Sequence, residues 1–216
     1  MLKRLFVFLF LVCGCQLLAL GQGSELNQLI DELQSKYNKM SSLAADFTQI
    51  YNSGSQTRRE SGHVVLKKPG KMRWDYTSPE TKLFLSDGKT LYEYVPAEKY
   101  AARSSIKESG DMRAPFAFLL GRGNLRRDFK VIEFAKEVPA RAGNKVLRMV
   151  PKRAADFKEL VLEIEPGSLQ ITRLTLIESG SARSDFLFSN VRENAPAGAD
   201  QFTFKAPAGV ELRTDN

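Results

Sequence analysis

The sequence has few of the residues that most often carry catalysis: two cysteines, one histidine and one tryptophan among 216 residues. Both cysteines, Cys13 and Cys15, lie in the apolar N-terminal segment. A chain that loses this segment can therefore form neither a disulfide nor a thiolate metal site. The single imidazole, His63, can build neither a His-rich zinc site nor a Cys–His pair. We expect a protein that is not an enzyme and needs no cofactor.

The remaining polar motifs are typical of turns and solvated strands. Glu108 and Asp111 lie in a glycine-containing loop, where acidic residues usually serve the turn itself. His63 alternates with apolar neighbours on a predicted strand, as structural histidines do. The alternative is a hydrolase that depends on His63, and loss of turnover in His63→Ala would support it.

Long apolar runs are absent except at the N-terminus, where two basic residues precede an apolar stretch over residues 5–20. The small residues Ala19 and Gly21 suit cleavage by signal peptidase. We therefore expect a signal peptide over residues 1–21, cleavage near Gly21 and export to the periplasm. Residues 22–216 then form a single domain, since no linker or repeat interrupts them.

A second way of processing the N-terminus stays open. Gly14 and Cys15 imitate the end of a lipobox, although a cysteine at position 13 is unusual there. Acylation of Cys15 would then replace cleavage at Gly21 and would anchor the chain in a membrane.

The formal charge of +7 suits acidic partners or anionic surfaces. Export makes nucleic acid an unexpected partner, and lysines and arginines commonly protect exposed strand edges. Four basic pairs could serve either role, contact with acidic partners or protection of strand edges: Arg58-Arg59, Lys67-Lys68, Arg126-Arg127 and Lys152-Arg153.

Two segments predict helices. Residues 24–40 place apolar side chains three or four positions apart, which is typical of an amphipathic helix. Residues 114–121 begin near a proline and end at a glycine, which favours one or two helical turns. The apolar stripe of the first helix is Leu26, Leu29, Ile30, Leu33, Tyr37 and Met40.

The rest of the chain alternates between apolar and polar residues, which predicts β-strands. An Asp87-Gly88 pair marks one hairpin turn. We count eleven antiparallel strands: 47–51, 62–66, 72–76, 83–85, 91–95, 100–104, 129–134, 145–150, 158–164, 170–177 and 183–190.

A sheet of this length curls, so it has a concave and a convex face. The fold class is therefore mainly β (α+β), with the two helices over an apolar concave face. Two outcomes stay open on pattern alone: an apolar hollow under a helical lid, or a fully packed helix-on-sheet core.

The order of several motifs resembles the LolA family of periplasmic outer-membrane lipoprotein carriers. The similarity covers nearly the whole chain after the signal segment. Its motifs are Phe47-Thr48-Gln49, Gly62, Leu66, Lys68–Tyr76, Pro79, Ser86–Leu91, Pro115–Leu120 and Phe202–Val210.

The resemblance implies an incomplete eleven-stranded antiparallel β-barrel whose hydrophobic cavity is covered by the N-terminal helix and a short lid helix. It also implies a monomeric chaperone that carries acylated lipoproteins from the inner to the outer membrane. An inner-membrane ATP-binding-cassette lipoprotein-releasing complex would load it, and an outer-membrane acceptor would unload it.

Carried over to this chain, the resemblance makes Lys68 a latch between sheet and lid, where the family usually has arginine. It places Met72 on the apolar wall. The other candidates for acyl-chain binding, each of which could equally be ordinary core, are Phe47, Trp74, Tyr76, Phe84, Phe116, Phe118, Leu119, Leu120, Leu29, Leu33 and Tyr37.

Two further functions of the same fold stay open. One is a membrane-anchored, LolB-like acceptor or lipid-binding lipoprotein, which would carry acyl chains on Cys15. The other is a sensor that binds lipid or misfolded protein through the same hollow.

Overall fold

A computed structural model describes residues 23–105, 116, 119, 123–153, 155, 157–178, 180 and 182–214. The predicted signal segment 1–21 lies outside these residues. So do Cys15, Glu108 and Asp111, which the sequence analysis singled out.

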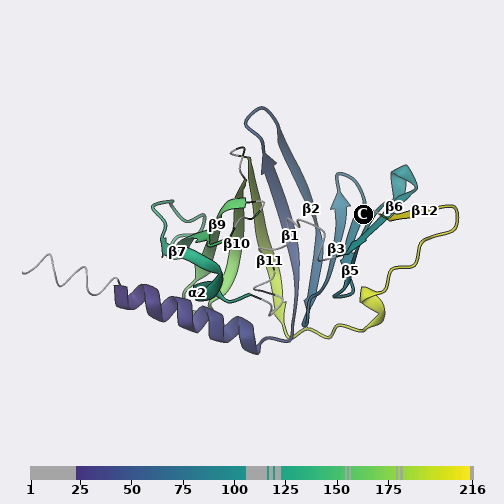
Figure 1. Ribbon diagram of the computed structural model, residues 1–216. Coiled ribbons are helices and arrows are strands. Elements are labelled where there is room, and N and C mark those ends of the chain that lie inside the picture. The colour runs from purple at the N-terminus through teal and green to yellow at the C-terminus, as the bar shows by residue number, and fades with distance from the viewer. Residues whose placement is uncertain are drawn as a thin grey trace, which may run out of the picture.

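Twelve strands form one open sheet (Figure 1), in the order β12-β6-β5-β4-β3-β2-β1-β11-β10-β9-β8-β7. Strand β1 pairs with β11 near the middle of the sheet, which joins the two halves of the chain. The strands are β1 Ser42–Asn52, β2 Thr57–Lys67, β3 Lys71–Ser78, β4 Lys82–Ser86, β5 Thr90–Val95, β6 Tyr100–Ser105, β7 Phe129–Phe134, β8 Lys145–Pro151, β9 Phe157–Glu165, β10 Gln170–Glu178, β11 Arg183–Glu193 and β12 Glu211–Thr214.

All eleven predicted strands are confirmed, but the count of eleven is one too low. Strand β12 adds four residues at one edge and runs parallel to β6, with Glu211 opposite Tyr100. All four residues of β12 are exposed. The strand therefore carries no burial alternation by which a sequence pattern could reveal it.

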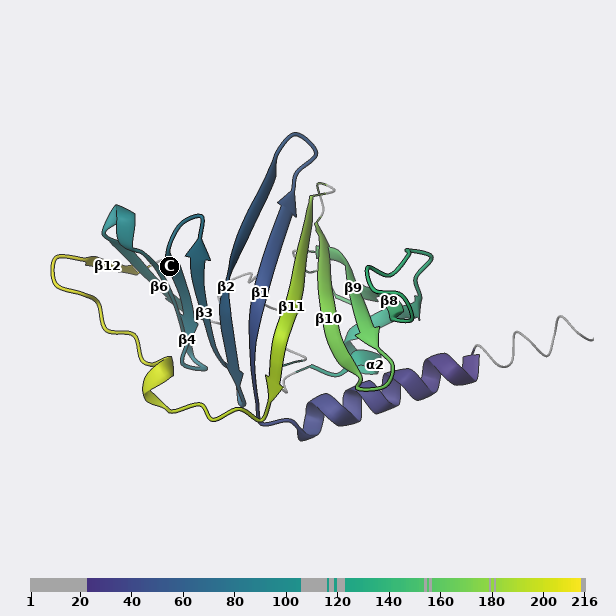
Figure 2. The same ribbon diagram turned by 180° about the vertical axis from the view of Figure 1, so that it is seen from behind.

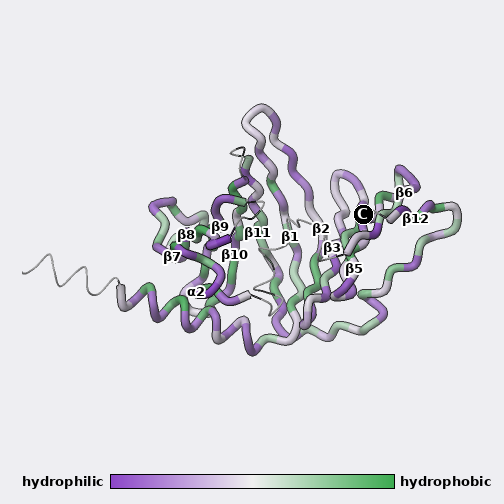
Figure 3. The backbone as a smooth tube through the Cα atoms, viewed as in Figure 1, coloured by the Kyte–Doolittle hydropathy of each residue, from purple (hydrophilic) through white to green (hydrophobic). Residues whose placement is uncertain are grey.

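Alternation on β3 shows how the sequence assigns the two faces. Met72, Trp74 and Tyr76 are buried. Lys71, Arg73 and Asp75, which alternate with them, are half-buried. Because successive side chains on a strand point to opposite faces, the three large apolar residues lie together. Figure 3 shows the same mixing of hydrophobic and hydrophilic positions along the strands and the N-terminal helix.

The N-terminal helix, residues 23–39, lies along one end of the sheet beside β9–β11 and the short helix α2, Leu125–Asp128 (Figures 1 and 2). Five of the six residues of its predicted stripe are buried, with Leu33 fully so, and Leu26 is half-buried. Polar contacts also hold it: Lys36 Nζ donates to the carbonyl oxygen of Ser168 at 2.6 Å, and Gln34 Oε1 accepts from the backbone N–H of Leu125 at 2.8 Å.

The phenol of Tyr37 anchors the helix to the sheet, and it makes the stability of the folded state decrease at alkaline pH. Its oxygen accepts a hydrogen bond from the backbone N–H of Ile171 on β10 at 3.1 Å. Burial raises the pKa of Tyr37, although this hydrogen bond acts the other way. Above about pH 10 the unfolded chain therefore loses the phenol proton, whereas the folded state keeps it. Tyr37 contributes stability below that pH, and this contribution decreases as the pH rises further.

We expect Tyr37→Phe to lower the free energy of unfolding by about 1–3 kcal/mol near neutral pH, because Ile171 loses its acceptor. We also expect the variant to have a shallower alkaline decline. Urea denaturation of both proteins over neutral and alkaline pH checks both effects. Tyr51→Phe, at a half-exposed position on β1, controls for loss of a hydroxyl. An alkaline decline equally steep in both proteins would contradict the assignment to Tyr37.

The C-terminal segment crosses the outer face of β3–β5 before it forms β12. Its short helix η3, Asp200–Phe202, contacts β3, and Phe202 is buried. Phe204 stacks on Tyr92 of β5, with ring centroids 5.1 Å apart. The motif Phe202–Val210, which the sequence shares with the LolA family, therefore covers part of the convex face.

Candidate functional site

Most of the predicted cavity residues meet in one buried apolar cluster on the helix-covered face. Nine of the twelve are buried members of this cluster, and Phe84 is half-buried against it. Phe118 and Leu120 lie outside the described residues. The nine buried residues are Leu29, Leu33, Tyr37, Phe47, Met72, Trp74, Tyr76, Phe116 and Leu119.

Trp74 lies at the centre of the aromatic part of this cluster. Its ring is 4.9 Å from Phe47 and 4.9 Å from Phe116, both in edge contacts. It also meets Phe186 of β11 at 5.6 Å, and Phe188 lies 6.5 Å away. We call the four of these residues that lie on strands, Phe47, Trp74, Phe186 and Phe188, the aromatic wall.

Phe186 and Phe188 were missed as site residues by the sequence analysis. Both lie on a strand that was predicted, and their alternation marks a buried face. What places them in the wall is the pairing of β1 with β11, which sets Phe188 opposite Phe47. This pairing joins segments far apart in the chain, so no local pattern reports it.

The cluster has two cover elements. Phe116 and Leu119 come from the segment predicted as a lid, and both are buried. Phe116 meets Phe186 edge-on at 5.2 Å, in addition to its contact with Trp74. The N-terminal helix is the second cover, through Leu29 and Leu33. In this structure the cover side chains pack directly on the sheet.

Three buried polar groups, from Tyr76, Gln49 and Trp74, lie within this apolar region. The hydroxyl of Tyr76 donates to Gln49 Oε1 at 2.7 Å, and both side chains are buried. The indole N–H of Trp74 is buried and has no hydrogen-bond partner among the described residues.

Lys68 lies at the end of the N-terminal helix. Its ammonium donates to the backbone carbonyl of Tyr37 and, at 3.1 Å, to that of Asn38. Burial lowers the pKa of Lys68. A cation at the C-terminal end of a helix also complements the helix dipole. A latch from Lys68 to the lid segment stays a prediction, because most of residues 115–120 lie outside the described part of the chain.

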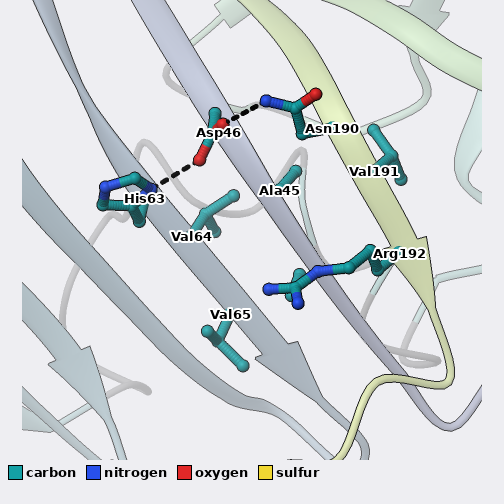
Figure 4. Close-up of a pocket in the computed structure, with 9 residues that line it drawn as sticks. Ala45, Asp46, His63, Val64, Val65, Asn190, Val191 and Arg192 are labelled. Atoms are coloured by element: carbon teal, nitrogen blue, oxygen red, sulfur yellow. Dashed lines mark hydrogen bonds and ion pairs between the residues drawn. The ribbon is translucent and has the colours of Figure 1, made fainter.

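A shallow hollow of about 590 Å³ lies on the opposite face of β1, β2 and β11 (Figure 4). There Asp46 accepts from Asn190 Nδ2 at 2.6 Å and contacts His63 Nδ1 at 2.5 Å. The hydrogen bonds from Asn190 and from His63 lower the pKa of Asp46. The imidazole is thus held by a strand carboxylate, which agrees with a structural histidine.

Within the described residues, no group of three or more His, Cys, Asp or Glu side chains could hold a metal ion. The same part of the chain contains no helix with the length and hydropathy needed to span a bilayer.

Comparisons with known proteins agree with this architecture. A family profile described as "Outer membrane lipoprotein carrier protein LolA" matches residues 38–205. The outer-membrane lipoprotein carrier protein of Bordetella avium is 30% identical over 90% of this chain and 89% of its own length. The protein of the same name from Azotobacter vinelandii is 30% identical, over 97% of this chain and 98% of its own.

A solved structure shows the same fold at low identity. An uncharacterised conserved protein from Thermus thermophilus superposes with a TM-score of 0.54 at 11% identity, over 89% of this chain and 99% of its own. The family match covers more than half of the chain and includes the strands that carry the aromatic wall. This chain belongs to the LolA family of outer membrane lipoprotein carrier proteins.

Proposed function

We propose that this protein is a periplasmic chaperone that binds the acyl chains of lipoproteins and carries them from the inner to the outer membrane. One observation carries the proposal: a buried aromatic wall on the sheet is covered by segments that are not themselves strands of the sheet. Membership of the LolA family supports the same conclusion.

Burial energies show why such a carrier needs a sheltered site. Moving one methylene from lipid to water costs about 0.8 kcal/mol, so three long acyl chains would cost on the order of 30 kcal/mol. Burying Phe116 and Leu119 is worth roughly 1.5–3 kcal/mol each. An acyl chain that enters from water can therefore replace these two side chains on the wall with a net decrease in free energy.

Leaving a membrane offers an acyl chain no comparable gain, because lipid is as apolar as the wall. Loading therefore needs work from outside this chain. We assign that work to an inner-membrane ATP-binding-cassette lipoprotein-releasing complex, and release to an outer-membrane acceptor. The protein acts as a monomer and performs no catalysis in this scheme.

The proposal includes export, with cleavage of residues 1–21 near Gly21. The mass of the protein recovered from the periplasm tests where the mature chain begins. A mass that includes acyl chains on Cys15 would instead support the membrane-anchored alternative.

Native mass spectrometry tests the function with a synthetic triacylated cysteine peptide and the same peptide without acyl chains. We expect a one-to-one complex with the acylated peptide and none with the peptide that lacks acyl chains. We also expect acylated polypeptide to be bound to the protein when it is released gently from the periplasm. Equal binding of both peptides, or binding of neither, would contradict the proposal.

A further inference from the structure

Trp74 buries a hydrogen-bond donor that none of the described residues satisfies. The side chain is 3% exposed, and its indole Nε1–H has no acceptor in that part of the chain. Unpaired buried polar groups are uncommon, and each costs about 1–3 kcal/mol. A phenylalanine at this position would supply an apolar ring without that cost. Because no described residue supplies the acceptor, the donor is open to an acceptor on a bound ligand.

The immediate surroundings of Trp74 are aromatic rings. Phe47, Phe116 and Phe186 all approach within 5.6 Å, in edge contacts. The nearby Tyr76 hydroxyl already donates to Gln49. A contact between the indole N–H and the face of a ring would recover only part of the cost of burying the donor.

Of the three rings close to Trp74, only Phe116 comes from a cover segment, whereas Phe47 and Phe186 lie on the strands of the sheet. Its centroid is 4.9 Å from the Trp74 ring. Whatever replaces Phe116 on the wall will therefore lie against the indole of Trp74.

We propose that the indole N–H of Trp74 donates a hydrogen bond to the carbonyl oxygen of an ester- or amide-linked acyl chain that replaces Phe116. This inference rests on the proposed function and names the chemical group that the wall recognises. An acyl linkage carries a carbonyl acceptor at the head of a hydrocarbon chain, and the indole offers a donor and no acceptor. The pair is complementary, and the apolar surroundings strengthen the bond.

The lone tryptophan makes this bond observable. A chain with one Trp gives one indole resonance in a proton–nitrogen correlation spectrum. The probes are a diacylglyceryl cysteine peptide and its dialkyl ether analogue, which has no ester carbonyl. We expect the indole proton to shift downfield with the ester peptide and much less with the ether analogue.

A variant gives a second measurement. Trp74→Phe keeps an aromatic ring in the wall and removes the donor. We expect its affinity for the ester peptide to fall about three- to tenfold, the equivalent of one net hydrogen bond, with a much smaller change for the ether analogue. Tyr92→Phe is the matched control, since it removes a polar hydrogen from a ring that stacks on Phe204 at the convex face.

Three outcomes separate the inference from the function on which it rests. If the wild-type chain binds neither peptide, the proposed function fails and the inference fails with it. If the wild-type chain binds both peptides and the indole resonance responds to both alike, only the inference is overturned. The same holds if Trp74→Phe weakens binding of both peptides to the same extent. The resonance is measured on the wild-type protein, so the result does not depend on how well the variant folds.

Discussion

Replacing Gly62 with alanine is expected to lower the free energy of unfolding by about 3 kcal/mol or more. A Cβ atom on Gly62 would lie 1.9 Å from the backbone carbonyl oxygen of Asp75 and 2.8 Å from the Cα of Tyr76. Both atoms belong to the backbone of β3, so no side-chain rotation can relieve the clash. The β2–β3 pair, which already has an irregular register between Ser61 and Gly62, would have to separate there.

Gly167→Ala provides the control for this prediction. Its added methyl group would meet nothing within 4 Å, so we expect a stability close to that of the wild-type chain. Urea denaturation followed by circular dichroism measures both variants. A Gly62→Ala protein as stable as Gly167→Ala would show that β2 and β3 do not approach this closely in solution.

Replacing Met72 with glutamate is expected to weaken client binding strongly at neutral pH. Met72 is 3% exposed and lies on β3, opposite Leu66 of β2, within the apolar cluster. An ionised carboxylate without a partner is costly among hydrocarbon groups, and an acyl chain would remove its remaining water. We expect the affinity for an acylated peptide to fall about tenfold or more. Acidic pH should restore part of it, because protonation removes the charge.

Three variants interpret the Met72 result. Met72→Leu conserves volume and should keep most of the affinity. Met72→Gln has nearly the size of the glutamate without its charge, so it should bind better than Met72→Glu at neutral pH and also controls for folding. Lys71→Glu introduces a carboxylate at the adjacent half-buried position of β3 and should bind as the wild-type chain does. A folded Met72→Glu protein with unchanged affinity would remove Met72 from the site.

Much of the strand architecture was predictable because the period of two is a local property. Residues 129–134 form β7 as predicted, and residues 170–177 form all but the last residue of β10. Strand β12 was not predictable, since its four exposed residues gain their strand conformation only by pairing with β6.

The candidate site was predictable in part for the same reason. Trp74 and Tyr76 were found because they alternate with polar residues on one strand. The place of Phe186 beside Trp74 depends on the order of strands in the sheet, which their sequence does not state. The contact of Lys68 with the end of the N-terminal helix also depends on how the helix crosses the sheet.

The sequence by itself determined the period of each element, the face on which each large apolar side chain lies, and the family to which the motifs point. The period and the face are short-range properties, set by neighbours a few residues apart, whereas the resemblance rests on the order of motifs along the chain. Only the tertiary structure decided that Phe116 of a cover segment packs on Trp74 of the sheet, and that the indole N–H of Trp74 is buried without an acceptor among the described residues. Such contacts join segments far apart in the chain, and they exist only when burial of the whole cluster offsets the entropy of bringing those segments together.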